Sequence, residues 1–101
     1  MKKIINGKKY DTDTANCVGD WANGYGHGDF QYAEERLYRK RTGEFFLHGE
    51  GGAMSNYAES YGNERYGGEK IIPLSENEAK KWAENHLNGD EYEKIFGSVD
   101  E

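Results

Sequence analysis

The chain contains little of several residue types that usually reveal the class of a protein. Its 101 residues include one cysteine, one proline and three histidines, and no apolar run exceeds a few residues. The single cysteine, Cys17, excludes an internal disulfide and fits a reducing cytosol. The short apolar runs argue against a membrane-spanning helix and a signal peptide. We therefore expect a cytoplasmic protein with no membrane partner.

Hydrophobic residues are also sparse, at 35% of the chain against 32% charged residues. Aromatic residues compensate at 14%, because each buried ring removes a large area from water. Eight of these aromatic residues are tyrosines, which suit half-exposed positions. A chain of this length is expected to form a single domain, residues 1–101, around one modest core.

Negative charge is in excess and is unevenly distributed. The net charge is −6, from 19 acidic and 13 basic residues. Basic residues cluster near the amino end and at residues 36–41, whereas residues 75–101 hold eight acidic residues against three basic ones, a net charge of −5. An acidic surface disfavours nucleic acid and anionic membranes as partners and favours basic protein surfaces.

The strongest structural signal is a hairpin predicted over residues 36–52, with its turn at 41–43. Gly43 permits the positive φ that a short hairpin loop needs. Alternation places Phe45 and Leu47 on one face of the second strand and Phe46 on the other. Because both faces carry large side chains, we expect this hairpin to lie at the centre of the sheet.

Further strands are predicted on both sides of this hairpin. Asn6-Gly7 between short apolar stretches predicts a first hairpin over residues 2–10. Residues 30–40 continue as extended chain into the central hairpin. Residues 69–74 form another strand, and Pro73 restricts it to a strand end or a sheet edge.

An amphipathic helix follows these strands. Ser75 and Glu78 form a capping box that starts a helix running to about Leu87. Its apolar stripe is Ala79, Trp82, Ala83 and either His86 or Leu87. Gly89, after Asn88, is expected to end the helix in a left-handed conformation. Residues 90–93 then repeat the cap pattern, before a shorter stripe of Tyr92, Ile95 and Phe96.

The remaining segments carry weaker signals. Thr12 or Asp13 is expected to cap one helical turn through Ala15 to Val18. Residues 19–29 predict an irregular loop or a loosely paired strand. Residues 53–68 are the segment expected to be mobile or shaped for a partner, with a short helix over 55–61 capped by Ser55.

Together these signals predict an α+β fold. It is a small antiparallel β-sheet of roughly four or five strands with the C-terminal amphipathic helix packed on one face. We expect Trp82 to be buried between helix and sheet, near Phe45 or Phe46.

No motif for catalysis, cofactor binding or metal binding stands out. The possible metal ligands are scattered singly, without paired spacing: Cys17, His27, His48 and His86. Cys17 lacks the local signature of a thiol enzyme. Glu34 and Glu35 are adjacent on a strand, so they point to opposite faces and cannot share a proton. We therefore expect neither an enzyme nor a cofactor.

Three runs carry a resemblance to a known family: residues 2–10, Gly-Glu-Phe-Phe-Leu-His-Gly-Glu-Gly-Gly at 43–52, and Glu-Lys-Ile-Ile-Pro-Leu-Ser at 69–75. The chain resembles a family of short acidic proteins carried by phages and other mobile elements of bacteria, some members of which are anti-CRISPR proteins acting on type II effector nucleases. The resemblance implies a binding protein that blocks a basic nucleic-acid-handling enzyme without chemistry of its own.

Three functions therefore remain open. The first is an inhibitor that binds a CRISPR effector nuclease by protein contact, without binding nucleic acid directly. The second is a regulatory module of a phage or mobile element with another protein target, and the third is an enzyme or metal protein. The expected partner-binding residues are acidic side chains of the helices and tyrosines of residues 57–66, namely Glu76, Glu84, Glu91, Glu93, Tyr57, Tyr61 and Tyr66.

Overall fold

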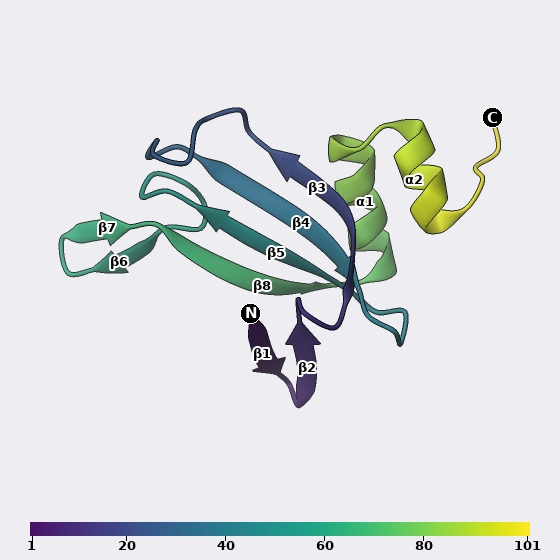
Figure 1. Cartoon of the computed structure of the whole chain (residues 1–101), viewed down its shortest axis with the longest axis horizontal. Helices are drawn as coiled ribbons and strands as arrows, with labels where there is room; N and C mark the ends of the chain where they lie inside the picture. The colour runs from purple at the N-terminus through teal and green to yellow at the C-terminus, as the bar shows by residue number, and fades with distance from the viewer.

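A computed structural model describes all residues, 1–101, as an antiparallel sheet with two helices after it. The strands are β1 (Lys2–Ile5), β2 (Lys8–Asp11), β3 (Asn16–Ala22), β4 (Ala33–Arg39), β5 (Phe45–Gly51), β6 (Glu59–Tyr61), β7 (Glu64–Tyr66) and β8 (Gly68–Leu74). The helices are α1 (Glu76–His86) and α2 (Gly89–Phe96). The central sheet has the order β3-β4-β5-β8, and β1-β2 and β6-β7 form separate hairpins (Figure 1). The predicted α+β class is confirmed.

The central hairpin is β4 and β5. Its register pairs Leu37 with Leu47 and Tyr38 with Phe46, and the turn places Gly43 at φ 92°. The Lys40 amide donates to the Glu44 carbonyl oxygen at 2.8 Å and closes the loop. Both strands have neighbours on each side in the sheet, as the large side chains on both faces predicted.

Alternation along these strands builds two hydrophobic clusters, one on each face of the sheet. The cluster under the helix contains Leu37, Phe45, Leu47, Ala79, Trp82 and Ala83, and the cluster on the opposite face contains Tyr10, Phe46 and Ile71. Trp82 is 8% exposed and shares the helix-side cluster with Phe45, so the predicted contact with Phe45 is confirmed. Phe46 is fully buried on the other face because neighbouring strand residues point to opposite sides.

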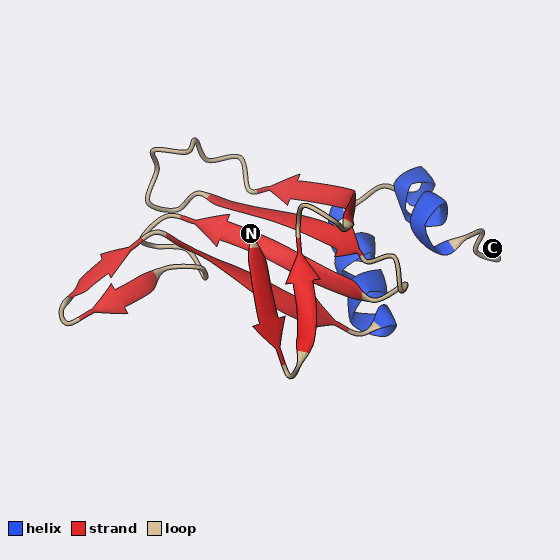
Figure 2. Ribbon diagram, turned by 60° about the horizontal axis from the view of Figure 1, so that its bottom comes forward, coloured by secondary structure: helices blue, strands red, loops and turns tan.

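The first hairpin, β1-β2, covers the face of the sheet that the helices leave open (Figure 2). Its turn has Asn6 at φ 51° and Gly7 at φ 77°, which is the type I′ geometry expected of Asn-Gly. Tyr10 meets Phe46 edge to face, with 5.5 Å between ring centroids. Burying an aromatic ring of this size contributes about 2–3 kcal/mol, which anchors the hairpin on the sheet.

The helical turn expected from Ala15 to Val18 is wrong. Asp11 organises the connection instead: its carboxylate accepts from the Asp13 amide at 2.9 Å, and its carbonyl oxygen accepts from the Ala15 amide at 3.1 Å. Strand β3 then begins at Asn16, because β4 offers backbone partners along its whole length. Part of the predicted irregular segment 19–29 therefore belongs to this strand, which has a bulge between Cys17 and Gly19.

The helix α1 begins as predicted and ends differently. Ser75 accepts from the Glu78 amide at 3.1 Å, and Glu78 accepts from the Ser75 amide at 2.9 Å. The predicted left-handed Gly89 is wrong, because α1 ends at His86 and its C-cap, Leu87, is extended. Asn88 and Glu91 form a second capping box that starts α2.

The N-cap of the second helix is therefore Asn88, two residues before Asp90, where the predicted cap pattern begins. The glycine with positive φ at a helix end is Gly97, at φ 93° after α2. The apolar side of α2 packs partly against the helix-side cluster, with 5.4 Å between the ring centroids of Phe96 and Phe45.

The short helix expected over residues 55–61 is also wrong. Ser55 does use its side chain as a local acceptor, from the Tyr57 amide at 3.2 Å, but this closes a turn. Strand β6 follows at Glu59 and pairs with β7, so the hairpin of these two strands projects from the end of the sheet (Figure 1). Tyr57 is 5% exposed, and its ring packs over Gly49 of β5. This contact fixes the path of the chain into β6.

Candidate functional site at the distal end of the sheet

The candidate site is the end of the sheet opposite to the β4-β5 turn, at the left of Figure 1. We call it the distal end and define it as the loops of residues 23–32 and 52–58 together with the β6-β7 hairpin. The Met54 amide donates to the Phe30 carbonyl oxygen at 2.7 Å, and the Gly52 amide donates to the Tyr32 carbonyl oxygen at 2.9 Å. These bonds hold the two loops side by side.

Glycines make this close approach possible. A Cβ on Gly52 would lie 2.6 Å from the carbonyl oxygens of Asp29 and Phe30, and a Cβ on Gly49 would lie 2.0 Å from the Tyr57 ring. Any side chain at these positions would displace backbone or a buried ring. The glycines in and just after the second half of β5 are therefore required for packing of the distal end.

The distal end exposes large apolar side chains that the rest of the molecule mostly buries. The exposed fractions are 47% for Tyr25, 67% for Phe30, 62% for Met54, 66% for Tyr61 and 47% for Tyr66. The rings of the last two are 5.7 Å apart and stand on the projecting hairpin. Exposed aromatic residues and methionine are the side chains enriched at the centres of protein interfaces.

Negative charge collects in the same region. The two segments that meet there, 20–36 and 48–70, contain eight acidic residues and three basic ones, a net charge of −5. Cross-strand register places Glu34, Glu50 and Glu69 next to one another across β4, β5 and β8. Like charges placed directly opposite each other destabilise a sheet, and the ion pair between Arg36 and Glu34 offsets part of this repulsion.

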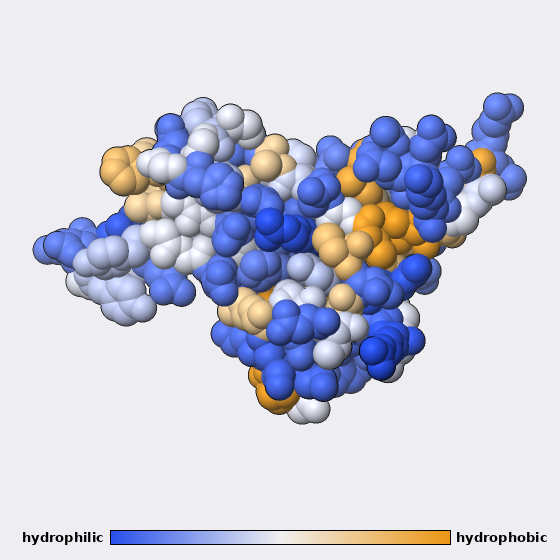
Figure 3. Space-filling view, viewed as in Figure 1, coloured by the Kyte–Doolittle hydropathy of each residue, from blue (hydrophilic) through white to orange (hydrophobic).

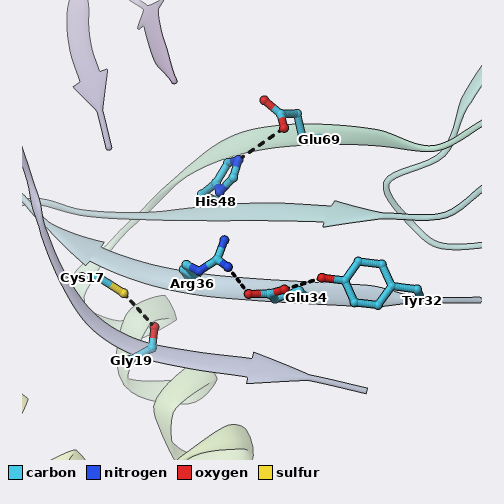
Figure 4. A network of polar contacts seen from close by, with 7 residues as sticks. All are labelled: Cys17, Gly19, Tyr32, Glu34, Arg36, His48 and Glu69. Atoms are coloured by element: carbon cyan, nitrogen blue, oxygen red, sulfur yellow. Dashed lines mark hydrogen bonds and ion pairs between the residues drawn. The ribbon is translucent and has the colours of Figure 1, made fainter. Parts of the chain in front are cut away.

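Figure 4 shows how polar side chains continue from this row along the open face of the sheet. Glu34 accepts hydrogen bonds from the Tyr32 hydroxyl and from the Arg36 guanidinium. Burial and the neighbouring Glu34 carboxylate raise the pKa of Tyr32 to about 12. Nε2 of His48 lies 3.8 Å from Oε2 of Glu69. This distance is too long for a hydrogen bond, so the buried Nε2 atom has no hydrogen-bond partner.

On the other face of the sheet, the Glu35 carboxylate lies close to three side chains, from α1 and from the loop before β6. It accepts from the Tyr57 hydroxyl and, at 2.9 Å, from Nε1 of Trp82, and Nε2 of His86 lies 3.8 Å away. Burial and the Glu35 carboxylate raise the pKa of Tyr57. Tyr57 is therefore a buried support of the distal end, whereas Tyr61 and Tyr66 are exposed as expected of contact residues.

The four glutamates expected to bind a partner are all exposed on the helices: Glu76, Glu84, Glu91 and Glu93. Two of them have local roles, since Glu91 accepts from the Asn88 amide at 3.1 Å and Glu93 accepts from the Val99 amide at 2.9 Å. The largest hydrophobic area in Figure 3 lies beside α2, where Ile95 and Phe96 are only partly buried.

The structure separates the four residues considered as metal ligands. Cys17 donates to the Gly19 carbonyl oxygen, His27 stacks on Tyr32, and His48 and His86 face Glu69 and Glu35 respectively. Desolvation raises the pKa of the Cys17 thiol, which keeps it protonated at neutral pH. No group of three or more His, Cys, Asp or Glu side chains is placed to hold a metal ion.

Sequence reasoning missed the exposed residues of two loops and the role of Glu35. Tyr25 and Phe30 lie in a glycine-rich stretch, and Met54 follows Gly51 and Gly52. Large apolar residues beside glycines were a usable sign of exposure, because such loops cannot bury them within the core. The turn of the central hairpin sets Glu34 opposite Glu50, but the place of Glu69 beside them had no sequence signal, because β8 joins the sheet after a long connection.

No protein-family model, curated protein or solved structure matches this chain. None of its helices has the length and apolar character needed to cross a membrane.

Proposed function

We propose that this protein is a non-enzymatic inhibitor that binds a type II CRISPR effector nuclease in the cytoplasm of a bacterial host and blocks its nucleic-acid binding or cleavage. The resemblance described from the sequence supports the choice of target. The observation that carries the proposal is that exposed aromatic side chains and excess negative charge share the distal end.

Each feature of the distal end fits a different part of such an interaction. Effector nucleases hold nucleic acid in positively charged channels, which attract an acidic surface. Long-range attraction raises the rate of association, whereas aromatic side chains buried at the contact slow dissociation. The exposed Tyr61 and Tyr66 rings stand on a narrow hairpin that is able to enter a channel.

The helix glutamates form a second acidic surface that adds to the attraction. Three lysines lie among them in α1 and α2 and reduce the local negative charge: Lys80, Lys81 and Lys94. Val99 is the one large hydrophobic side chain of residues 75–101 that is well exposed, at 60%. We therefore assign Glu76, Glu84, Glu91 and Glu93 to steering and the distal end to direct contact.

A cleavage assay tests the proposal. Purified protein is added to a guide-loaded type II effector, and cut DNA is measured with increasing salt. We expect inhibition that weakens as salt rises, because screening reduces the attraction between exposed charges. Replacing Tyr61 and Tyr66 with alanine should abolish inhibition.

A charge-reversed control separates the two surfaces. Glu84→Lys with Glu93→Lys spares Glu76, in the first turn of α1, and Glu91, which caps α2. Its one structural cost is the bond from the Val99 amide to Glu93, in the chain after α2. This double variant should slow association and retain inhibition at high protein concentration. Full inhibition by the tyrosine variant would move the contact to the helices. No inhibition of any effector, with capture of a different host protein, would favour a regulatory module with another target.

A further inference from the structure

We propose that the pocket at Glu35 binds a guanidinium group, the cationic head of an arginine side chain. The pocket has a volume of about 510 Å³ and lies on the helix side of the sheet, between the end of α1 and the loops of the distal end. Trp21, Tyr25, Glu35, Tyr57 and His86 line it, together with three amide side chains.

Glu35 supplies a charge that the free protein leaves without a strong basic partner. Its side chain is 17% exposed, and its hydrogen bonds come from the neutral donors Tyr57 and Trp82. Other partly buried or paired glutamates differ: Glu34 has Arg36, and Glu44 has Lys8 at 2.9 Å. No lysine or arginine forms an ion pair with Glu35, and His86 is its sole potential cation at 3.8 Å.

This arrangement fixes the carboxylate in place. A carboxylate accepts about four hydrogen bonds, and two donors already orient the two oxygens of Glu35. Each oxygen retains capacity for a further donor. Because a partly buried charge is less well hydrated than an exposed one, a cation that reaches this carboxylate gains more than it would at an exposed glutamate.

The walls of the pocket favour a planar cation. Trp21 lies against His86 at a tilted angle, with 4.5 Å between ring centroids, and Tyr25 stands at the rim with nearly half of its surface exposed. Aromatic faces attract cations, and a guanidinium stacks on them more readily than an ammonium because it is flat and weakly hydrated. Gln31 and Asn56 also line the pocket with amide side chains. The Asn23 oxygen accepts from the Tyr25 and Ala33 amides and so holds the lining in shape.

Two sources of a guanidinium are possible: an arginine of a protein that docks on the distal end, and a free guanidino compound. Tyr25 and Met54 belong both to the pocket lining and to the exposed residues of the distal end. An arginine presented by a docked protein would therefore enter from the contact surface. This inference does not depend on the identity of the target, because it concerns a side-chain chemistry alone.

Titration followed by two-dimensional ¹H–¹⁵N NMR tests the inference. The chain has two tryptophans, Trp21 and Trp82, and the indole N–H groups of both report on this site. The probes are acetyl-Gly-Arg-Gly-amide, the same peptide with citrulline as the neutral isostere, the same peptide with lysine, and agmatine. We expect saturable shifts with the arginine peptide, none with citrulline and weaker binding with lysine.

Agmatine distinguishes the two sources, because it carries the guanidinium without a peptide backbone. Equal affinity for agmatine and the arginine peptide would assign the pocket to a free guanidino compound, and tighter binding of the peptide would assign it to a protein arginine. Both outcomes support a guanidinium site. Equal shifts with the arginine and citrulline peptides would overturn it.

Variants locate the binding. Glu35→Gln keeps an acceptor for Trp82 and removes the charge, and it should raise Kd for the arginine peptide by about tenfold or more. Asp100→Asn removes an exposed charge from the chain after α2 and should leave Kd unchanged. Tyr25→Ala, at an exposed rim position, should weaken binding several-fold and provides a second test that does not disturb the core. Unchanged binding in both Glu35→Gln and Tyr25→Ala would overturn the assignment.

Discussion

The two small hairpins of this protein have similar lengths and opposite surroundings. In β1-β2, Tyr10 is 6% exposed and contacts Phe46, whereas in β6-β7 Tyr61 and Tyr66 are 66% and 47% exposed and contact each other. A two-stranded hairpin alone is only marginally stable in water. The first hairpin gains its stability from docking on the sheet, and the second leaves its aromatic rings available to a partner.

The same contrast extends to the two ends of the central sheet. The end beside the β4-β5 turn is covered by α1 on one face and by β1-β2 on the other. Basic residues of the β1-β2 and β4-β5 hairpins meet there. Lys8 pairs with Glu44 at 2.9 Å, and the Lys40 ammonium lies 3.7 Å from the centre of the Tyr10 ring. The distal end has exposed rings and excess negative charge. One end therefore supports folding, and the other is suited to binding.

The largest expected effect comes from removing the anchor of the covered end. Trp82→Ala should lower the free energy of unfolding by about 3 to 5 kcal/mol, because it leaves a cavity between helix and sheet. It also removes the donor to Glu35. Urea denaturation followed by circular dichroism measures the change. A free energy of unfolding equal to that of the wild type would show that α1 does not dock through this face.

A matched pair of tyrosine substitutions tests the contrast between hairpins directly. Tyr10→Ala should destabilise by about 3 kcal/mol, since it removes a buried ring from the Phe46 cluster. Tyr61→Ala removes the same side chain from an exposed hairpin and should change stability by less than about 0.5 kcal/mol. Equal losses in the two variants would mean that β6-β7 is also part of the core.

Removing the cap of α1 should have a smaller effect. Ser75→Ala should cost about 1 kcal/mol, because the Glu78 amide loses its acceptor. Asn88→Ala is the control on α2, which buries no residue and should contribute less to global stability. Thermal melts of both variants measure the difference. A Ser75→Ala variant as stable as the wild type would place the start of the helix elsewhere.

The smallest effect on stability should accompany the largest effect on function. Replacing both Tyr61 and Tyr66 with alanine should change the free energy of unfolding by no more than about 0.5 kcal/mol, as for other exposed positions. The same variant should lose inhibition in the cleavage assay. A variant that unfolds would show that the contact between the two rings stabilises the protein and would remove the contrast between the hairpins.

Local sequence was a reliable guide where a residue interacts with near neighbours. Asn6-Gly7, Gly43 and the Ser75-Glu78 box all lie where their chemistry predicted, because turn and cap geometry depends on a few adjacent residues. Gly89 shows the limit of this reasoning. It suits a helix end, but Asn88 is the stronger N-cap and starts α2 there.

The errors over residues 15–18 and 55–61 have a shared cause. A good capping residue precedes or begins each segment, Thr12 or Asp13 for the first and Ser55 for the second. Both segments became strands or turns because a partner strand or a buried ring was within reach. Backbone pairing with β4 fixes β3, and the hydrogen bond from Tyr57 to Glu35 fixes the path into β6. Tertiary contacts of this kind outweigh a helix signal only a few residues long.

The sequence by itself determined the α+β class, the central hairpin and the helix that covers it, because alternation and capping act between residues close along the chain. The tertiary structure alone decided which tyrosines are buried and which are exposed, and where charge collects. Glu34, Glu50 and Glu69 meet only through the register of three strands, and Glu35 meets Tyr57 and Trp82 only because their elements pack on one face. Contacts between residues far apart in the sequence depend on the packed fold, which the pattern within one segment does not specify.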